Sequence, residues 1–489
     1  MVLPNYDNNL NFSHINNALQ KPDYKFEDCF LNQPINTHMI YKSLPHLLIA
    51  VFIVGFMSHP TTAQVNTDVD TSAIDDLFSQ WDEEGSPGCA VGIYHEDEII
   101  YENGYGEANL DYGIPNKPGT VFYIGSVSKH FAAAAIAILA DKEKIDLDED
   151  INEYIEEMPE YDETIRIKDL VYHTSGIYDL YSLLSLAGIN VENVLSLQDK
   201  VDLISSQSTL NFEPGSDYMY SNSGYTLMNK VIKEASGKTL PEFTDAYIFE
   251  PLGMEDTHFH DDRTKIVPRR ALSYQPDGDG FSLSYINNFE GVGPGGLYTT
   301  IEDMLKWDSN FYDNQIEESP NFYDIMHTPG VLSDGDTLDY AFALNLDEHK
   351  GQKRYGHGGS FMGFRADYRR FPEHHFSTAV FCNLGNINPG NITEQIADIY
   401  LVEAFEEYLE EFAGTYHNSD MEVDYEVKVK EGNLYLDRDA SPSGEMSYSD
   451  TDEYNIGGWS FEFTRDDNGE IDGFKASSAR AQDLIFERR

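Results

Sequence analysis

Basic residues are scarce in this chain, which has 32 lysines and arginines against 86 aspartates and glutamates over 489 residues, a formal net charge of −54. Proteins that bind nucleic acids or adsorb to anionic membranes rely on clustered basic side chains. The scarcity argues against both, and no nucleic acid is expected as a partner. A strongly acidic surface suits a salty medium, where counterions screen its self-repulsion. On this hypothesis added NaCl preserves stability, and a loss of stability on adding NaCl would contradict it.

Cysteine is also scarce, with three residues in the whole chain. Cys29 lies in the polar N-terminal part, whereas Cys89 and Cys382 each lie in an apolar, strand-like run. The pattern favours two buried thiols in the core, and a disulfide between Cys89 and Cys382 is the alternative.

The N-terminal part lacks an apolar run of comfortable membrane-spanning length. Residues 47–57 are apolar, Lys42 precedes them, and Thr61 and Ala63 follow, which is typical of a secretory signal cleaved after Ala63. The sequence thus predicts a signal peptide at 39–63, a secreted or periplasmic protein, and no stable membrane span after cleavage. Because the pattern begins at Met39, residues 1–38 are interpreted as an over-extended reading frame. The alternative is a single N-terminal anchor with a short cytoplasmic tail.

The rest of the chain has the composition of a globular protein, with 40% hydrophobic and 13% aromatic residues. Residues 66–405 mix helical and strand-like segments and form the first predicted domain. Residues 406–489 alternate apolar and polar side chains between hairpin turns at 431–433 and 466–469. This alternation predicts a small antiparallel β domain, in which no catalytic residue is evident.

Ser126 and Lys129 stand at the start of a strongly helical segment, residues 131–140, which is apolar and free of glycine and proline. Residues three apart share one helix face, so the amine can reach the hydroxyl. A helix N-terminus also supplies free N–H groups that favour an oxyanion. The spacing therefore predicts a nucleophilic serine with a lysine base. The alternative is a helix-capping serine followed by a surface lysine.

Two further motifs carry candidate site residues. Tyr220 and Asn222 are two positions apart in a stretch predicted to be extended, so their side chains are expected on the same side of the chain. A tyrosine near an ammonium group can act as a base with a lowered pKa. Turn chemistry is the alternative interpretation. His357 stands among glycines, including Gly358 and Gly359, which allow a ligand to approach the backbone closely.

Metal-binding motifs such as H-E-x-x-H do not stand out. Residues 373–375, Glu-His-His, come nearest and are interpreted as a solvated turn. His173, in the run His-Thr-Ser-Gly at 173–176, is interpreted as a hydrogen-bonded corner. We expect neither a metal nor a cofactor.

Taken in order, Ser126-x-x-Lys129, Tyr220-Ser-Asn222 and His357-Gly-Gly359 resemble the three active-site motifs of penicillin-binding-protein-like serine hydrolases. Within that group the chain is most similar to class C β-lactamases and their esterase and D-aminopeptidase relatives, over about residues 70–400. The resemblance implies an α+β fold, with an antiparallel sheet flanked by helices and a helical subdomain, and the site between them. The β domain resembles barrels appended to such hydrolases.

The resemblance also implies roles. Ser126 would be the nucleophile, Lys129 its activating partner, Tyr220 the general base or acid, and Asn222 a ligand of the substrate amide or ester. The backbone N–H groups of Ser126 and Ser360, beside Gly359, would form the oxyanion hole. His357 replaces the lysine of the β-lactamases, and Gly358 replaces the threonine or serine that follows. The loss of that lysine is unfavourable for a substrate carboxylate and suits the esterase and peptidase branches.

The predicted function is therefore a serine hydrolase that acts through an acyl-enzyme on an ester, amide or peptide. Its partner would be a small-molecule or peptide acyl substrate, with cell-wall-derived compounds among the candidates. Ester, D-amino-acid amide, muropeptide and lactam stay open. The alternative is a catalytically silent scaffold that binds cell-wall or protein partners through its β domain, and the retention of all three motifs speaks against it.

Overall fold

The computed structural model describes residues 65–67, 69, 71–190, 193–285, 290–438 and 442–489. The predicted extension at 1–38, the predicted signal peptide at 39–63 and Cys29 lie outside these residues. Within the described ranges, no helix is both long and apolar enough to cross a membrane.

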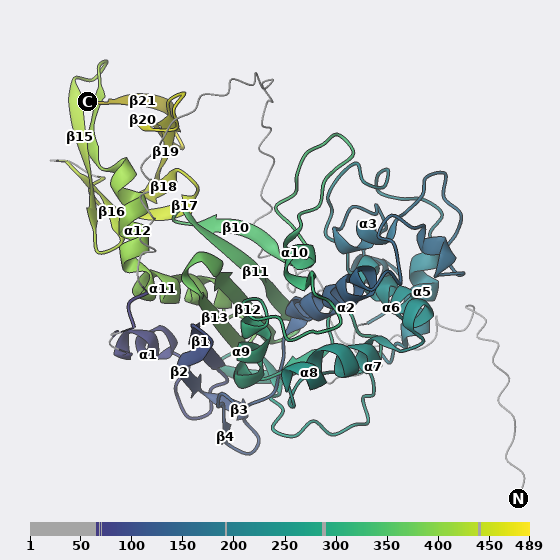
Figure 1. Cartoon of the computed structure of the whole chain (residues 1–489). Helices are drawn as coiled ribbons and strands as arrows, with labels where there is room; N and C mark the ends of the chain where they lie inside the picture. Colours follow the sequence, from purple (N-terminus) through teal and green to yellow (C-terminus); the bar gives the residue numbers. More distant parts are fainter. Residues whose placement is uncertain (1–64, 68, 70, 191–192, 286–289, 439–441) are drawn as a thin grey trace, which may run out of the picture. The chain divides into compact units, whose positions relative to one another are not determined.

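A six-stranded sheet forms the centre of the first predicted domain, in the order β10-β11-β12-β13-β1-β2 (Figure 1). Every neighbouring pair is antiparallel, as expected from the sequence. The central strands β1 and β13 are apolar and almost wholly buried. The strands are β1 (Cys89–His95), β2 (Glu98–Tyr105), β10 (Asn345–His349), β11 (Gln352–Phe361), β12 (Phe364–Phe371) and β13 (Phe376–Cys382).

Helices cover the sheet and form a separate helical region in which α6 packs against α2, α3, α5 and α7. The helices are α1 (Ser72–Phe78), α2 (Lys129–Asp141), α3 (Ile167–Val171), α4 (Leu180–Leu186), α5 (Leu197–Ser205), α6 (Asn222–Ser236), α7 (Leu240–Thr244), α8 (Glu250–Leu252), α9 (Ile301–Ser309), α10 (Phe322–His327), α11 (Pro389–Tyr400) and α12 (Val402–Leu409). Tighter or wider turns are η3 (Gly125–Ser128), η4 (Ile151–Glu153), η5 (Asp245–Phe249), η6 (Pro372–His374) and η7 (Glu410–Phe412). Short strands are β3 (Glu107–Asn109), β4 (Ile114–Pro115), β5 (Phe122–Tyr123), β6 (His258–Phe259), β7 (Ser273–Asp277), β8 (Gly280–Tyr285) and β9 (Leu297–Thr299).

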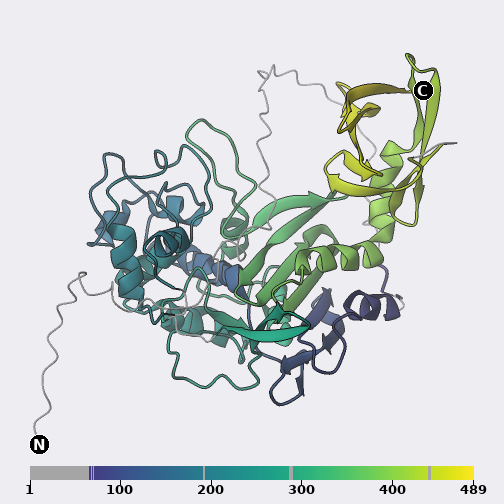
Figure 2. The same ribbon diagram turned by 180° about the vertical axis from the view of Figure 1, so that it is seen from behind.

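The two faces of the sheet are covered by different helices, because alternate residues of a strand point in opposite directions. Val91 of β1 belongs to a core cluster with Phe78 of α1 and Ile396 of α11. Figure 2 shows α11, in green, lying across this face. On the other face, the Tyr94 hydroxyl donates a hydrogen bond to the carbonyl of Ile301, at the start of α9. The sheet is therefore a buried middle layer.

The cysteine interpretation was wrong in one respect: Cys89 and Cys382 are buried, but they form a disulfide with a Cα–Cα distance of 4.0 Å. The reason is register. β1 and β13 are antiparallel neighbours in which Cys89 lies directly opposite Cys382, although 293 positions separate them in the sequence. Sequence patterns place each cysteine in a strand but do not say which strands are adjacent.

The predicted β domain contains a closed antiparallel barrel with a dense aromatic core, including Phe412, Tyr416, Phe463, Phe474 and Phe486. Helix α12 packs against β15 and β16 and runs across the predicted boundary at 405/406, which stays a prediction. The barrel strands are β14 (Gly414–Asn418), β15 (Val423–Lys430), β16 (Asn433–Asp437), β17 (Gly444–Asp450), β18 (Glu453–Ile456), β19 (Trp459–Arg465), β20 (Ile471–Ser478) and β21 (Ala481–Arg488).

Candidate active site

Ser126 lies in η3, a short 3-10 helix that leads directly into α2. Gly125 enters this turn with φ of 55°, a left-handed conformation that glycine adopts at little cost. Ser126 is partly exposed, whereas its neighbours Gly125 and Val127 are buried. The turn therefore presents one hydroxyl at the end of a buried helix, as the sequence predicted.

Lys129 is wholly buried one turn further on. Its Nζ atom lies 3.0 Å from Ser126 Oγ, 2.9 Å from Asn222 Oδ1 and 2.8 Å from the carbonyl oxygen of Pro294. The four groups come from η3, α2, the start of α6 and the glycine-rich loop before β9. The structure thus brings Ser126, Lys129 and Asn222 together, although 93 positions of sequence separate Lys129 from Asn222.

The environment of Lys129 makes it a base at neutral pH. Burial lowers the pKa of its ammonium group from 10.5 to about 7, and the nearby Asp179 carboxylate offsets part of that shift. Near pH 7 a large fraction of the side chain is therefore the neutral amine, which can accept a proton from Ser126.

Tyr220 stacks its ring against the same lysine, with Lys129 Nζ 4.8 Å from the ring centroid. Its hydroxyl oxygen is buried near the Ser126 hydroxyl and makes no well-formed hydrogen bond to a described residue. Burial raises the pKa of Tyr220 well above its usual range, and Ser126 offsets only part of this. The expected lowering of the Tyr220 pKa by an ammonium group was thus wrong, because desolvation outweighs it. At pH 7 Tyr220 keeps its proton, which suits the general-acid half of its predicted role.

Asn222 was predicted to lie in an extended stretch, and this prediction was wrong, because Asn222 is the first residue of α6. Ser221 before it is extended, and that residue alone separates Tyr220 from the helix. Both side chains still reach Lys129, because the change from strand to helix geometry occurs between them.

His173 lies directly behind Tyr220, with 4.3 Å between the ring centroids. Its Nδ1 accepts a hydrogen bond from the backbone N–H of Ser221, so Nε2 carries the proton and donates to the Tyr340 hydroxyl, 3.1 Å away. Burial lowers the pKa of His173 well below its usual value, which keeps the ring neutral. His173 therefore fixes the backbone next to Tyr220.

His357 lies on β11, and its Nδ1 donates to the adjacent Gly358 carbonyl. Burial, reinforced by the Lys129 charge, lowers the pKa of His357 to about 3, so the ring is neutral at pH 7. Its Nε2 is then an acceptor, and it is buried without a hydrogen-bond partner among the described residues. The ring centroid of Tyr220 is 6.0 Å away. The Tyr220 hydroxyl oxygen and His357 Nε2 are thus two buried polar atoms without a well-formed hydrogen bond, one on each side of the site.

The backbone of β11 comes unusually close to η3. A Cβ atom on Gly125 would lie 2.6 Å from the backbone nitrogen of Ser360, and one on Gly359 would lie 3.1 Å from that of Ser126. Only glycines permit this approach. The two N–H groups predicted to form an oxyanion hole are therefore neighbours, with the Ser126 side chain at the same turn.

A beta-lactamase family model matches residues 74–400. The chain belongs to the beta-lactamase family. It resembles a D-aminopeptidase of Gluconobacter oxydans (strain 621H), at 27% identity over 298 residues, covering 61% of this chain and 56% of that protein. A D-aminopeptidase of Brucella anthropi is 28% identical over 302 residues, with coverage of 61% and 56%. The chain thus spans little more than half the length of these curated relatives.

Among solved structures, the octameric penicillin-binding protein homologue from Pyrococcus abyssi matches with a TM-score of 0.60 at 20% identity, covering 86% of this chain and 100% of that one. At this identity the likeness shows the fold alone. The predicted fold and the predicted resemblance to penicillin-binding-protein-like hydrolases are both confirmed.

Sequence reasoning missed two groups in this beta-lactamase family site. The Pro294 carbonyl is a backbone acceptor in a glycine-rich loop and has no side-chain signature. Asp179 opens α4 as its N-cap, and the only sequence signal was an acidic residue before an apolar helical run.

Residues 373–375, the nearest sequence candidate for a metal site, are used in contacts with β11. Glu373 pairs with Lys353 at 3.0 Å, and His374 Nε2 lies 2.7 Å from the side-chain oxygen of Gln352. Among the described residues, no group of three or more His, Cys, Asp or Glu side chains is placed to hold a metal ion.

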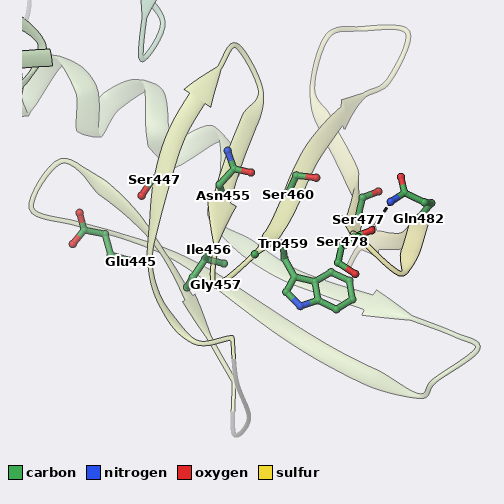
Figure 3. Close-up of a pocket in the computed structure, with 12 residues that line it drawn as sticks. Glu445, Ser447, Asn455, Ile456, Gly457, Trp459, Ser460, Ser477, Ser478 and Gln482 are labelled. Carbon is green, nitrogen blue, oxygen red and sulfur yellow. Dashed lines mark hydrogen bonds between the residues drawn. The ribbon is translucent and has the colours of Figure 1, made fainter. Parts of the chain in front are cut away.

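The barrel has an open hollow formed by β17 to β21, and this hollow is separate from the residues around Ser126 (Figure 3). Its lining includes the indole of Trp459, the apolar Ile456 and the acidic Glu445, together with neutral polar side chains such as Asn455 and Ser460. None of the sequence-predicted site residues lines it. The hollow and the cluster around Ser126 are therefore different parts of the described structure.

Proposed function

We propose that this protein is a serine hydrolase that cleaves amide, peptide or ester substrates through an acyl-enzyme on Ser126. The observation that carries the proposal is the environment of Lys129. Its amine is close to its titration point at neutral pH, and Nζ lies 3.0 Å from Ser126 Oγ. The other two N–H groups of Lys129 donate hydrogen bonds to Asn222 Oδ1 and to the Pro294 carbonyl oxygen.

Acylation follows from this arrangement. A neutral amine has two N–H groups and one lone pair, so when Asn222 and Pro294 accept the N–H groups, the lone pair faces Ser126. The Ser126 proton passes to Lys129 as Oγ attacks the substrate carbonyl carbon. The negative charge that develops on the carbonyl oxygen would be held by the N–H groups of Ser126 and Ser360.

Collapse of the tetrahedral intermediate requires a proton on the leaving group. Tyr220 is the donor, because its high pKa keeps the phenol protonated and its hydroxyl lies next to Ser126. The resulting phenolate would recover a proton from the Lys129 ammonium group, 4.8 Å from the Tyr220 ring. Neutral Lys129 then accepts a proton from the water that attacks the acyl carbon, and this proton passes to Ser126 Oγ as the acyl–Oγ bond breaks and the acid leaves.

The substrate class is the finer part of the proposal. The curated relatives are named D-aminopeptidases, and His357 is neutral at pH 7, so it provides no positive charge for a substrate carboxylate. Both features favour esters and D-amino-acid amides over β-lactams. A cell-wall-derived peptide is a further candidate within the amide class.

The test is a turnover panel with the full chain and its Ser126→Ala variant. The substrates are a short-chain nitrophenyl ester, a D-alanyl amide, a muropeptide and a chromogenic cephalosporin. We expect turnover that Ser126→Ala abolishes without unfolding, fastest on the ester or the D-alanyl amide. Turnover that survives in Ser126→Ala would overturn the mechanism. A silent panel would instead support the scaffold alternative.

We also propose export to an oxidising compartment, by cleavage after Ala63. The support is the buried Cys89–Cys382 disulfide, because such bonds persist outside the reducing cytosol. N-terminal sequencing of the exported protein should begin at Gln64. A start before residue 39 would contradict the interpretation of residues 1–38.

A further inference from the structure

We propose that Asp179 is a positioning residue, which locks the Asn222 amide in one orientation and thereby aims the Lys129 lone pair at Ser126. The inference deepens the proposed function and rests on it. Asp179 touches none of the reacting groups itself and would act only through Asn222.

The carboxylate of Asp179 joins two helix N-termini. Its Oδ2 accepts hydrogen bonds from both the backbone N–H and the side-chain Nδ2 of Asn222, each at 2.8 Å. Its Oδ1 accepts from the backbone N–H groups of Tyr181 and Ser182, at 3.0 and 3.1 Å. Asp179 thus caps α4 with one oxygen and holds the first residue of α6 with the other, where helix dipoles also favour a negative charge.

These contacts leave the Asn222 amide a single orientation. A carboxylate only accepts hydrogen bonds, so the NH₂ group of Asn222 must face Asp179. The two Lys129 N–H groups that are not aimed at Ser126 only donate, so the Asn222 oxygen must face Lys129. A turned amide would place its oxygen against the carboxylate and its N–H groups against the amine, and would lose both bonds.

The orientation matters because Lys129 has few anchors. Asn222 Oδ1 and the Pro294 carbonyl are the acceptors that fix its N–H groups, and the lone pair takes the direction that remains. If Asn222 turned, one anchor would be lost and the amine could rotate away from Ser126. A misdirected base slows proton transfer even where its protonation state is right.

Other groups that face Lys129 are uncharged at pH 7. The rings of Tyr220 and Tyr225 lie 4.8 and 5.4 Å from Nζ, and both phenols have raised pKa values through burial. His357 and His173 act on the lysine from β11 and from the turn after α3, and burial keeps both neutral. Among the described groups that shift Lys129, Asp179 alone supplies negative charge.

The decisive variant is Asp179→Asn. Asparagine caps helices as well as aspartate does, so its oxygen can keep the N–H groups of α4 and the fold should survive. Its NH₂ group then faces two donors of Asn222: the side-chain amide is forced to turn, and the hydrogen bond from the backbone N–H is lost. Asp150→Asn is the matched control, because Asp150 is likewise a half-buried N-cap, whose carboxylate accepts from the N–H of Asn152.

Two readouts are measured on the full chain. One is the rate at which a fluorophosphonate labels Ser126 as a function of pH. The other is the titration of the lysines by NMR with ¹³Cε-labelled lysine, with the Lys129 signal assigned through Lys129→Met. For Asp179→Asn we expect the rate of Ser126 labelling to fall on the order of tenfold to a hundredfold. The midpoint of the Lys129 titration should move to lower pH, because a negative charge has been removed. Asp150→Asn should match the wild type in both.

A double-variant comparison separates positioning from general damage. If Asp179 acts through Asn222, then Asn222→Ala and the double variant Asp179→Asn/Asn222→Ala should label at similar rates, because the second change removes nothing further. Unchanged labelling and an unchanged Lys129 midpoint in Asp179→Asn would overturn the proposal. If the wild type is not labelled at all, the hydrolase proposal fails, while the NMR titration still decides whether Asp179 acts on Lys129.

Discussion

The serine-containing core and the barrel are both built from buried aromatic side chains, yet they treat polar groups differently. Around Ser126, buried polar atoms without a well-formed hydrogen bond occur on His130, Tyr220 and His357. In the described part of the barrel, the Tyr454 hydroxyl is the one such atom. Lys129 is wholly buried, whereas the barrel lysine Lys428 has a side chain that is 48% exposed.

Burying a polar group without a partner costs free energy, so folded proteins carry few such groups. Those around Ser126 lower the stability of this region and keep a desolvated amine, a protonated phenol and a neutral imidazole acceptor side by side, although other such atoms occur elsewhere in the described part of the first domain, for example on Trp307 and Tyr312. In the described part of the barrel this cost is confined to the Tyr454 hydroxyl. The comparison teaches that burial lowers the pKa of a lysine wherever it occurs, at Lys129 as at Lys200, and that the contact with Ser126 distinguishes the first from the second.

The largest effect is expected from removing the buried base. Lys129→Met keeps the length and bulk of the side chain but cannot accept the Ser126 proton, so kcat/KM should fall by at least about a hundredfold. Lys200→Met is the control, because Lys200 is also buried and has its pKa lowered to about 7, but bonds to the Gly291 carbonyl outside the site. Steady-state kinetics should show a far smaller loss for Lys200→Met. Equal losses would mean that burial alone, and not the contact with Ser126, accounts for the effect.

The buried hydroxyl of Tyr220 provides the next test. Tyr220→Phe should lower turnover of a D-alanyl amide by about a hundredfold, because an amine leaving group needs a proton. It should slow a nitrophenyl ester much less, because nitrophenolate leaves without one. The ratio of amide to ester turnover, measured on one preparation, checks this role. An equal loss on both substrates would contradict it.

Activity should depend on pH in a direction set by Lys129. Below its pKa of about 7 the ammonium group cannot accept a proton, and above it the amine can. The rate kcat/KM should therefore rise about tenfold per pH unit below pH 7 and level off above it. A kcat/KM that falls as the pH rises across this range would contradict a lysine base. In Lys129→Met the rise of kcat/KM with pH should disappear.

The smallest effect is expected in the barrel. Tyr454→Phe removes a buried hydroxyl without a partner and should leave turnover unchanged, while it raises the free energy of unfolding by about 1 kcal/mol. Denaturant unfolding and turnover of the same sample measure both. A loss of turnover comparable with that of Tyr220→Phe would remove the distinction between the two regions.

Much of this arrangement could be predicted from the sequence, because the signals are local. The apolar run after Lys129 predicts a buried helix, alternation predicts the barrel strands, and the order of three short motifs predicts that Ser126, Lys129 and Tyr220 meet. Each helix, strand and motif is read from residues within a few positions of one another, whereas the meeting of the motifs is what their resemblance to a known family implies.

The remaining features depend on contacts between distant segments. The pairing of Cys89 with Cys382 follows from strand adjacency, which no local pattern encodes. The direction of the Tyr220 pKa shift follows from how deeply its hydroxyl is buried. The Pro294 carbonyl is a backbone atom, which every residue possesses, and the contact of Asp179 with Asn222 joins side chains 43 positions apart, which no local pattern encodes.

The central claim is that Ser126 carries the acyl group, and the most direct measurement is the mass of the trapped intermediate. The full chain is mixed with an excess of a nitrophenyl ester, quenched in acid within the first turnovers, digested and analysed by mass spectrometry. The account predicts an added acyl mass on the peptide that contains Ser126, absent from Ser126→Ala and reduced in Lys129→Met. Turnover without that adduct, or an adduct on another residue, would contradict it.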